Sequence, residues 1–255
     1  MDGGPRRFAA YVALGDSMSM DVYPAQELGP AASTAAVGAA SLFHRNVDDL
    51  WPEFAGQDLV SRHDGIAIHD LTVDGATAGD VMARQLPALK RIPDIGDRPS
   101  VVTLTAGGND LIHLLLTVAR DQLDRAAAQV PGSIAQVVRA VRDALPQSLL
   151  LLTTTYDPTD GTGELPGLSE EFGRLPVELL ESCNEQVRTL AAATPGVVLA
   201  DAHQHFLGHG VSAPRAERWY WSQSMIEPGL TGASELRRVW LASSEFGEPE
   251  SAASA

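Results

Sequence analysis

Five short apolar runs, each typical of β-strands, alternate with helix-like segments along this 255-residue chain. The runs cover residues 8–14, 66–73, 101–105, 149–154 and 197–200. The helix-like segments, in which apolar residues recur three or four positions apart, cover residues 79–89, 111–128, 134–144, 177–193 and 232–242. Strands that alternate with helices are joined by right-handed crossovers and form a mainly parallel sheet. The pattern predicts an α/β fold, a three-layer α/β/α sandwich with a five-stranded parallel sheet.

The spacing of these elements predicts one domain over residues 1–246, followed by a flexible tail over residues 247–255. Residues 21–62 interrupt the alternation, because prolines, glycines and an Ala/Ser/Thr-rich stretch replace any clear period. Insertions at the functional edge of an α/β sheet often shape a pocket. We therefore expect residues 21–62 to form an irregular excursion near the functional site.

Charge and composition restrict the partners of the chain. Its formal net charge of −15 argues against a broad basic face that would bind nucleic acid or an anionic membrane. No run approaches the roughly 20 apolar residues that span a bilayer. The single cysteine, Cys183, leaves no internal disulfide framework and suits a reducing compartment. We expect a cytoplasmic protein whose oligomeric state the sequence does not indicate.

Small and polar residues follow the first three strand-like runs. Ser17 ends a Gly-Asp-Ser motif after the first run, Gly75 follows the second, and Asn109 lies in a Gly-Gly-Asn-Asp motif after the third. Because the carboxyl ends of parallel strands meet at one edge of a sheet, we expect these three residues to lie close together. Asp16 and Asp110, beside them, are interpreted as carboxylates that brace the loops.

These motifs resemble the three leading blocks of the SGNH hydrolase superfamily, the GDSL-type esterases and lipases. The resemblance covers residues 8 to about 242 and implies the flavodoxin-like fold of that superfamily. It implies that Ser17 is the nucleophile, and that the backbone N–H groups of Ser17 and Gly75 and the side-chain amide of Asn109 form the oxyanion hole. Each role suits the residue type, since attack on an ester carbonyl creates an oxyanion that needs preplaced donors.

The fourth block of the family departs from the pattern. The family ends with Asp-x-x-His-Pro, in which the histidine is the base, whereas this chain has Ser224-Met-Ile-Glu227-Pro228. In one interpretation Glu227 is the base and the Ser224 hydroxyl orients it by a hydrogen bond. The two changes make sense as a pair, because a glutamate beside the family's usual aspartate would place two carboxylates together and raise the pKa of one of them sharply. In a second, His209 reaches Ser17 from the segment after the fifth run. In a third, no base works.

The resemblance therefore predicts a serine hydrolase that cleaves a small carboxylic ester through an acyl-enzyme on Ser17, with no cofactor. Two alternatives stay open: a catalytically lapsed ligand-binding protein of the same fold, and an acyltransferase to a sugar or polyol hydroxyl. Asp201, His203 and His205 have alternate-residue spacing that could hold a metal, but local hydrogen bonds are the favoured interpretation. The expected partner is thus a small-molecule ester.

Overall fold

The computed structural model describes residues 7–29, 32, 34–166 and 174–244. The tail expected over residues 247–255 lies outside these described residues. None of the helices in the described part of the chain combines the length and the apolar character that a bilayer span requires.

A parallel five-stranded sheet forms the centre of the molecule, in the order β2-β1-β3-β4-β5. The strands are β1 (Ala10–Leu14), β2 (Ala67–Asp70), β3 (Ser100–Thr105), β4 (Leu149–Thr153) and β5 (Val197–Ala200). All five lie within or beside the predicted runs, and their order is the flavodoxin-like one. The chain order reverses direction at β1, which pairs with β2 on one side and β3 on the other. Ligands of such sheets bind beyond the carboxyl ends at this reversal.

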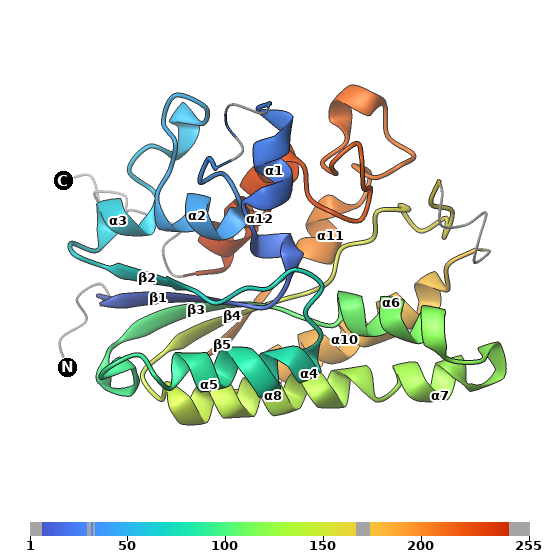
Figure 1. Cartoon of the computed structure of the whole chain (residues 1–255), viewed down its shortest axis with the longest axis horizontal. Coiled ribbons are helices and arrows are strands. Elements are labelled where there is room, and N and C mark those ends of the chain that lie inside the picture. Colours follow the sequence, from blue (N-terminus) through green and yellow to red (C-terminus); the bar gives the residue numbers. More distant parts are fainter. Residues whose placement is uncertain (1–6, 30–31, 33, 167–173, 245–255) are drawn as a thin grey trace, which may run out of the picture.

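Helices cover both faces of the sheet, so the predicted three layers are confirmed (Figure 1). One layer contains α1 (Val22–Glu27), α2 (Ala39–His44), α3 (Leu59–Arg62), α11 (Ala202–Phe206) and α12 (Leu230–Ser243). The other contains α4 (Ala78–Asp80), α5 (Leu86–Leu89), α6 (Gly108–Thr117), α7 (Leu123–Ala127), α8 (Val130–Ala144) and α10 (Val177–Ala193). Successive residues of β1 point alternately into the two layers, as the period of a strand requires.

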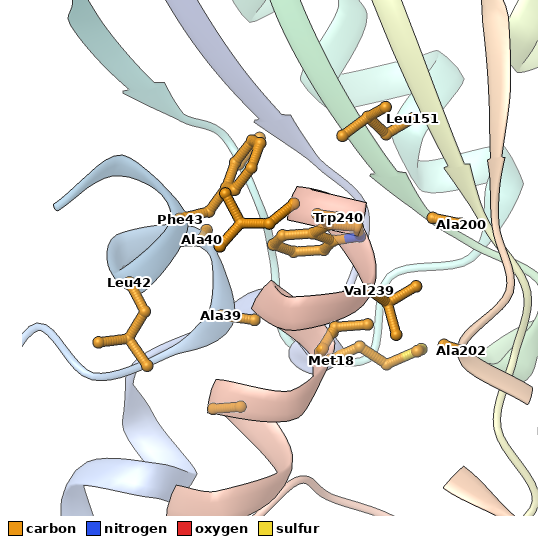
Figure 2. Packing of buried hydrophobic residues seen from close by; sticks show 14 of the residues in the cluster. Met18, Ala39, Ala40, Leu42, Phe43, Leu151, Ala200, Ala202, Val239 and Trp240 are labelled. Carbon is orange, nitrogen blue, oxygen red and sulfur yellow. The ribbon is translucent and has the colours of Figure 1, made fainter. Parts of the chain in front are cut away.

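The core between α2, α12 and the sheet anchors the chain turn that follows β1. Figure 2 shows Trp240 of α12 between Phe43 of α2 and the strands, with the two rings edge to face at 5.6 Å. The indole N–H of Trp240 donates to the Thr153 hydroxyl at 3.0 Å, so this buried polar group is satisfied. Met18 is buried in the same cluster, a burial that contributes about 2 kcal/mol. The turn that carries Ser17 is therefore tied to the core.

Three segments differ from the expectation. The helix predicted over residues 111–128 is broken, because the backbone is extended at Val118 and Ala119, and α7 packs back against α6 and α10. The helix predicted over residues 79–89 contains one π-helical turn, Val81–Gln85, between α4 and α5. Residues 21–62, expected to be irregular, carry α1, α2 and α3.

Candidate active site

The turn after β1 positions Ser17 through a glycine that no other residue can replace. Gly15 has a φ of +121°, and a Cβ at this position would lie 2.0 Å from the Thr105 carbonyl oxygen. Gln85, the last residue of the π-helical turn, accepts from the Gly15 N–H at 2.8 Å and donates to its carbonyl at 2.7 Å. A π-helical turn often marks a functional site, and here it positions the Gln85 side-chain amide for both hydrogen bonds to Gly15. The backbone entering the Ser17 turn is therefore fixed from both sides.

Ser17 begins a single 3₁₀ turn at the carboxyl end of β1 and is 6% exposed. The Asp16 carboxylate caps this turn by accepting from the Met18 N–H at 3.2 Å, and the Asp16 N–H donates to the Thr105 hydroxyl. Burial is the main cause that raises the pKa of Asp16 to about 6. Asp16 thus braces the loop, as the sequence suggested, while the Ser17 N–H has no acceptor among the described residues.

Asn109 and the Gly75 turn lie against the same edge of the sheet. The Asn109 side-chain amide donates to the Ala76 carbonyl at 3.2 Å, and to the Asp16 carboxylate at 3.5 Å. Gly75, with a φ of +69°, lies in the turn next to Ala76, and within the described chain its N–H has no acceptor. Asp110 holds the following segment by accepting from the Ala78 N–H at 2.9 Å. The structure therefore brings together the turns of all three predicted blocks, with two backbone donors unused.

Glu227 lies beside Ser17, with only 8% of its surface exposed. The pKa of Glu227 is raised to about 7, chiefly by burial and further by the negative charges of Asp74 and Asp16. A hydrogen bond from the Ser17 hydroxyl acts in the opposite direction and lowers this pKa. Its Oε2 atom is buried and, within the described residues, has no hydrogen-bond partner. This carboxylate can therefore take up a proton near neutral pH.

The loop that carries Glu227 is held by the backbone on both sides. The Glu227 N–H donates to the Ser224 carbonyl at 3.0 Å, and the Glu227 carbonyl accepts from the Trp221 N–H at 2.8 Å. The buried Tyr156 hydroxyl donates to the Ile226 carbonyl at 2.9 Å. Ser224 closes this turn through its carbonyl, and the described contacts include no hydrogen bond from its hydroxyl to Glu227. The role expected for the Ser224 side chain therefore stays a prediction.

His209 lies outside the cavity that contains Ser17 and Glu227. Its ring stacks on Trp219 at 3.6 Å, and its Nδ1 lies 3.0 Å from the Glu217 carbonyl oxygen. The structure thus brings Glu227, and not His209, to the nucleophile.

The other residues with metal-ligand spacing have separate partners. Asp201 pairs with Arg188, His203 lies 3.3 Å from Glu181, and His205 lies 2.9 Å from Glu235. Among the described residues no three His, Cys, Asp or Glu side chains come together in a way that could hold a metal ion.

A cavity of about 130 Å³ opens beside Ser17 and Glu227 and is lined mainly by apolar side chains. Its apolar wall consists of Leu111, Ile112 and Leu115 of α6, Leu123 of α7, and Val177, Leu179 and Leu180 of α10. Sequence reasoning missed this wall, although α6 carried a signal. Five of its ten residues are Leu or Ile, yet none of the ten is buried in the core. Leu111 and Leu114 pack against the core while only partly buried, so the rest of this apolar helix presents a surface to something else.

A model of the GDSL-like Lipase/Acylhydrolase family matches residues 13–223, a span that includes Ser17, Gly75 and Asn109 and ends before Glu227. A search among curated proteins found no match. Among solved structures, the chain is similar to an extracellular lipase from Streptomyces rimosus, with 20% identity, 92% of this chain and 99% of that chain covered, and a TM-score of 0.59.

Two further solved structures have the same fold. A phospholipase A1 from Streptomyces albidoflavus is 18% identical, with 93% of this chain and 100% of that chain covered and a TM-score of 0.56. An acetylxylan esterase from Geobacillus stearothermophilus is 16% identical, with 95% and 96% covered and a TM-score of 0.60. The fold is shared with these enzymes, and the family match over most of the chain decides the assignment. The chain belongs to the GDSL-like lipase/acylhydrolase (SGNH) family.

Proposed function

We propose that this chain hydrolyses carboxylic esters through an acyl-enzyme on Ser17, with Glu227 as the general base. The observation that carries the proposal is the buried Glu227 carboxylate, which lines the same apolar cavity as Ser17 and whose pKa responds to the Ser17 hydroxyl. A serine hydroxyl is a weak nucleophile until a neighbour takes its proton. Within the cavity wall, Glu227 is the group that contacts this hydroxyl and titrates near neutral pH.

In the first step the Glu227 carboxylate accepts the Ser17 proton while the Ser17 Oγ attacks the ester carbonyl carbon. The carbonyl oxygen becomes an oxyanion. Two donors that are unused in the described part of the structure, the N–H groups of Ser17 and Gly75, support it. The Asn109 amide joins them by exchanging its 3.5 Å contact with Asp16 for the oxyanion. One such donor typically contributes about 3–4 kcal/mol of transition-state stabilisation.

In the second step the tetrahedral centre collapses, the bond to the alcohol oxygen breaks, and the Glu227 carboxylic acid gives its proton to that oxygen. The acyl group stays on Ser17. Water then attacks the acyl carbon as Glu227 takes a proton from it, and the proton returns to the Ser17 Oγ as the carboxylic acid leaves. Glu227 ends as a carboxylate, so the cycle is closed.

The environment of Glu227 supports its role in place of an imidazole. An ordinary carboxylate is too weak a base at neutral pH, and a general base is most effective when its pKa lies near the working pH. Burial and the charges of Asp74 and Asp16 bring the pKa of Glu227 to about 7. Loss of the family's histidine is thereby compensated by the position of the glutamate.

The apolar wall formed by α6, α7 and α10 supports an apolar acyl chain as the part of the ester that enters the cavity. Each buried CH₂ group contributes about 0.8 kcal/mol, so an octanoyl ester should react faster than an acetyl ester. In Leu115→Trp the larger side chain should fill the cavity and lower kcat/KM for the octanoyl ester more than for the acetyl ester. Leu207→Trp, on an exposed residue away from the cavity, is the matched control.

Covalent labelling tests the nucleophile and the base together. A fluorophosphonate probe should label the parent chain and not Ser17→Ala, and Glu227→Gln should label far more slowly because the hydroxyl keeps its proton. Glu217→Gln, an exposed acid outside the cavity, is the control and should label like the parent. Absence of labelling in the parent chain, together with binding of an ester without turnover, would instead identify a lapsed ligand-binding protein.

A further inference from the structure

The charged side chains beside the nucleophile all have the same sign. Asp16, Asp157 and Glu227 line the cavity, and no Lys, Arg or His of the described residues does so. Asp74, in the turn before Gly75, lies close enough to act on Glu227 as a like charge. The Tyr23 hydroxyl donates to the Asp74 carboxylate at 2.7 Å and so fixes its position. A substrate bound to Ser17 therefore meets negative charge without a compensating cation.

The position of Glu227 indicates which part of a bound ester lies in this acidic region. Its Oε2 atom is buried without a partner among the described residues, and the side chain is more than nine-tenths buried. In the proposed mechanism Glu227 must reach the leaving alcohol oxygen in order to protonate it. The alcohol part of the ester therefore lies beside Glu227, within reach of the charge of Asp74, which acts from outside the cavity lining, whereas the acyl chain lies against the apolar wall.

We infer that the site prefers esters whose alcohol part is cationic or neutral and discriminates against esters whose alcohol part is anionic. This inference rests on the ester hydrolysis proposed above. Asp74 would repel an anionic group on the substrate. The same group would raise the pKa of Glu227 and so favour its protonated form, which cannot act as a base. A cationic group would have the opposite effect on both. The selection is electrostatic, so salt should weaken it.

Three esters of one acyl group and similar size test the inference. They are butyrylcholine, the neutral dimethylbutyl ester of the same shape, and the anionic sulfopropyl ester. Each kcat/KM is divided by the rate at which neutral hydroxylamine cleaves the same ester, which removes differences in leaving-group reactivity without introducing a charged nucleophile. At low salt we expect the cationic ester to exceed the anionic one by about tenfold, and the ratio to shrink at 1 M salt, as expected for charges within about 10 Å.

Asp74→Asn supplies the matched variant, because this exposed side chain takes no part in the chemistry. It should reduce the cation-to-anion ratio. With the neutral ester it should also move the acid limb of kcat/KM to lower pH, since Asp74 helps to raise the pKa of Glu227. The groups that face Glu227 and stay in place are Ser17 and Asp16 after β1, Tyr23 of α1 and Tyr156 after β4. Asp121→Asn, outside the cavity, should leave both readouts unchanged.

Equal normalised rates for all three esters, each lost in Ser17→Ala, would overturn the charge preference and leave the hydrolase function standing. A faster reaction of the anionic ester would overturn it as well. Failure to cleave any ester, combined with absence of fluorophosphonate labelling, would overturn the proposed function and with it the inference.

Discussion

Two segments that follow β5 each contain candidate bases, and they differ in whether the candidate lines the cavity that contains Ser17. In the segment from Asp201 to His209, His205 lies 2.9 Å from Glu235 and the His209 ring stacks on Trp219, while His203 lies 3.3 Å from Glu181 although its buried Nε2 forms no hydrogen bond among the described residues. None of the three histidines lines the cavity that contains Ser17. In the segment from Trp221 to Pro228, Glu227 lines the cavity beside Ser17, and its buried Oε2 has no hydrogen-bond partner in the described part of the chain. The comparison teaches that residue type alone does not select a base. In the mechanism proposed above, the base is the group that the fold places beside the nucleophile with an oxygen free to accept a proton.

Glu227→Gln breaks the comparison with the largest expected effect. It keeps the size of the side chain and removes the base, so kcat/KM should fall about a hundredfold to ten-thousandfold. In the parent chain kcat/KM should rise through about pH 7 as Glu227 loses its proton, and this limb should vanish in the variant. A residual limb of unchanged pKa in Glu227→Gln would move the base to another residue.

The stability of the same variant should depend on pH in a defined direction. The pKa of Glu227 is raised from 4.5 to about 7, so between these values the folded chain keeps a proton that the unfolded chain releases. The unfolding free energy of the parent therefore falls as pH rises through this window, by about 3 kcal/mol at ~1.4 kcal/mol per pKa unit. Glutamine lacks this fall, so Glu227→Gln should be more stable than the parent at pH 8.

Urea unfolding of parent and variant at pH 4.5 and pH 8 measures this difference. Asp16, whose pKa is raised from 3.8 to about 6, adds a similar fall at lower pH, but it does so in both proteins and cancels. A stability difference between parent and variant that stays constant with pH would contradict the raised pKa of Glu227.

Substitution of Glu27, which holds the helix start after the Glu227 loop, should have an intermediate effect on activity. The Glu27 carboxylate, on α1, accepts from the Leu230 N–H at 2.7 Å and so holds the start of α12, directly after the Glu227 loop. Glu27→Ala should cost about 1 kcal/mol of stability, as loss of a helix cap does. It should lower kcat severalfold with little change in KM, because Glu27 positions Glu227 and does not touch substrate. Glu27→Gln keeps an acceptor and should restore most of kcat; if it fails to, charge and not position explains the effect.

The smallest expected effect on kcat/KM is that of replacing His209. His209→Ala removes a ring stacked on Trp219, outside the cavity, so kcat/KM and its pH profile should stay within about twofold of the parent. A large loss of activity, rescued by added imidazole, would show that His209 reaches Ser17 and would reverse the comparison.

The parts of the fold that the sequence predicted depend on local pattern. All five strands and their parallel arrangement agree with the apolar runs, and the turns carrying Ser17, Gly75 and Asn109 meet because carboxyl ends of parallel strands share one edge. The prediction of one continuous helix over residues 111–128 was wrong at Val118, where the backbone is extended. The apolar residues keep their helical spacing across this position, so the sequence pattern does not reveal the break. The break allows α7 to pack against α6 and α10.

For the candidate site, too, the sequence predicted the features that depend on local pattern and not those that depend on packing between distant segments. Glu227 was the favoured candidate base from the sequence, because Pro228 and the start of the last helix follow it, and His209 was the alternative that only a structure could test. The apolar cavity was missed, since its wall comes from α6, α7 and α10, which are separate in the chain.

The amino-acid sequence by itself determined the strand pattern, the glycine that turns the chain after β1, and the meeting of the Ser17, Gly75 and Asn109 turns at one edge of the sheet. These features depend on backbone sterics and on the alternation of apolar segments, which act over a few residues. Only the tertiary structure decided which carboxylate lies buried beside Ser17, which side chains the histidines contact, and where an apolar cavity opens. Burial and hydrogen-bond pairing are set by segments far apart in the chain, and a pKa responds to all of them together.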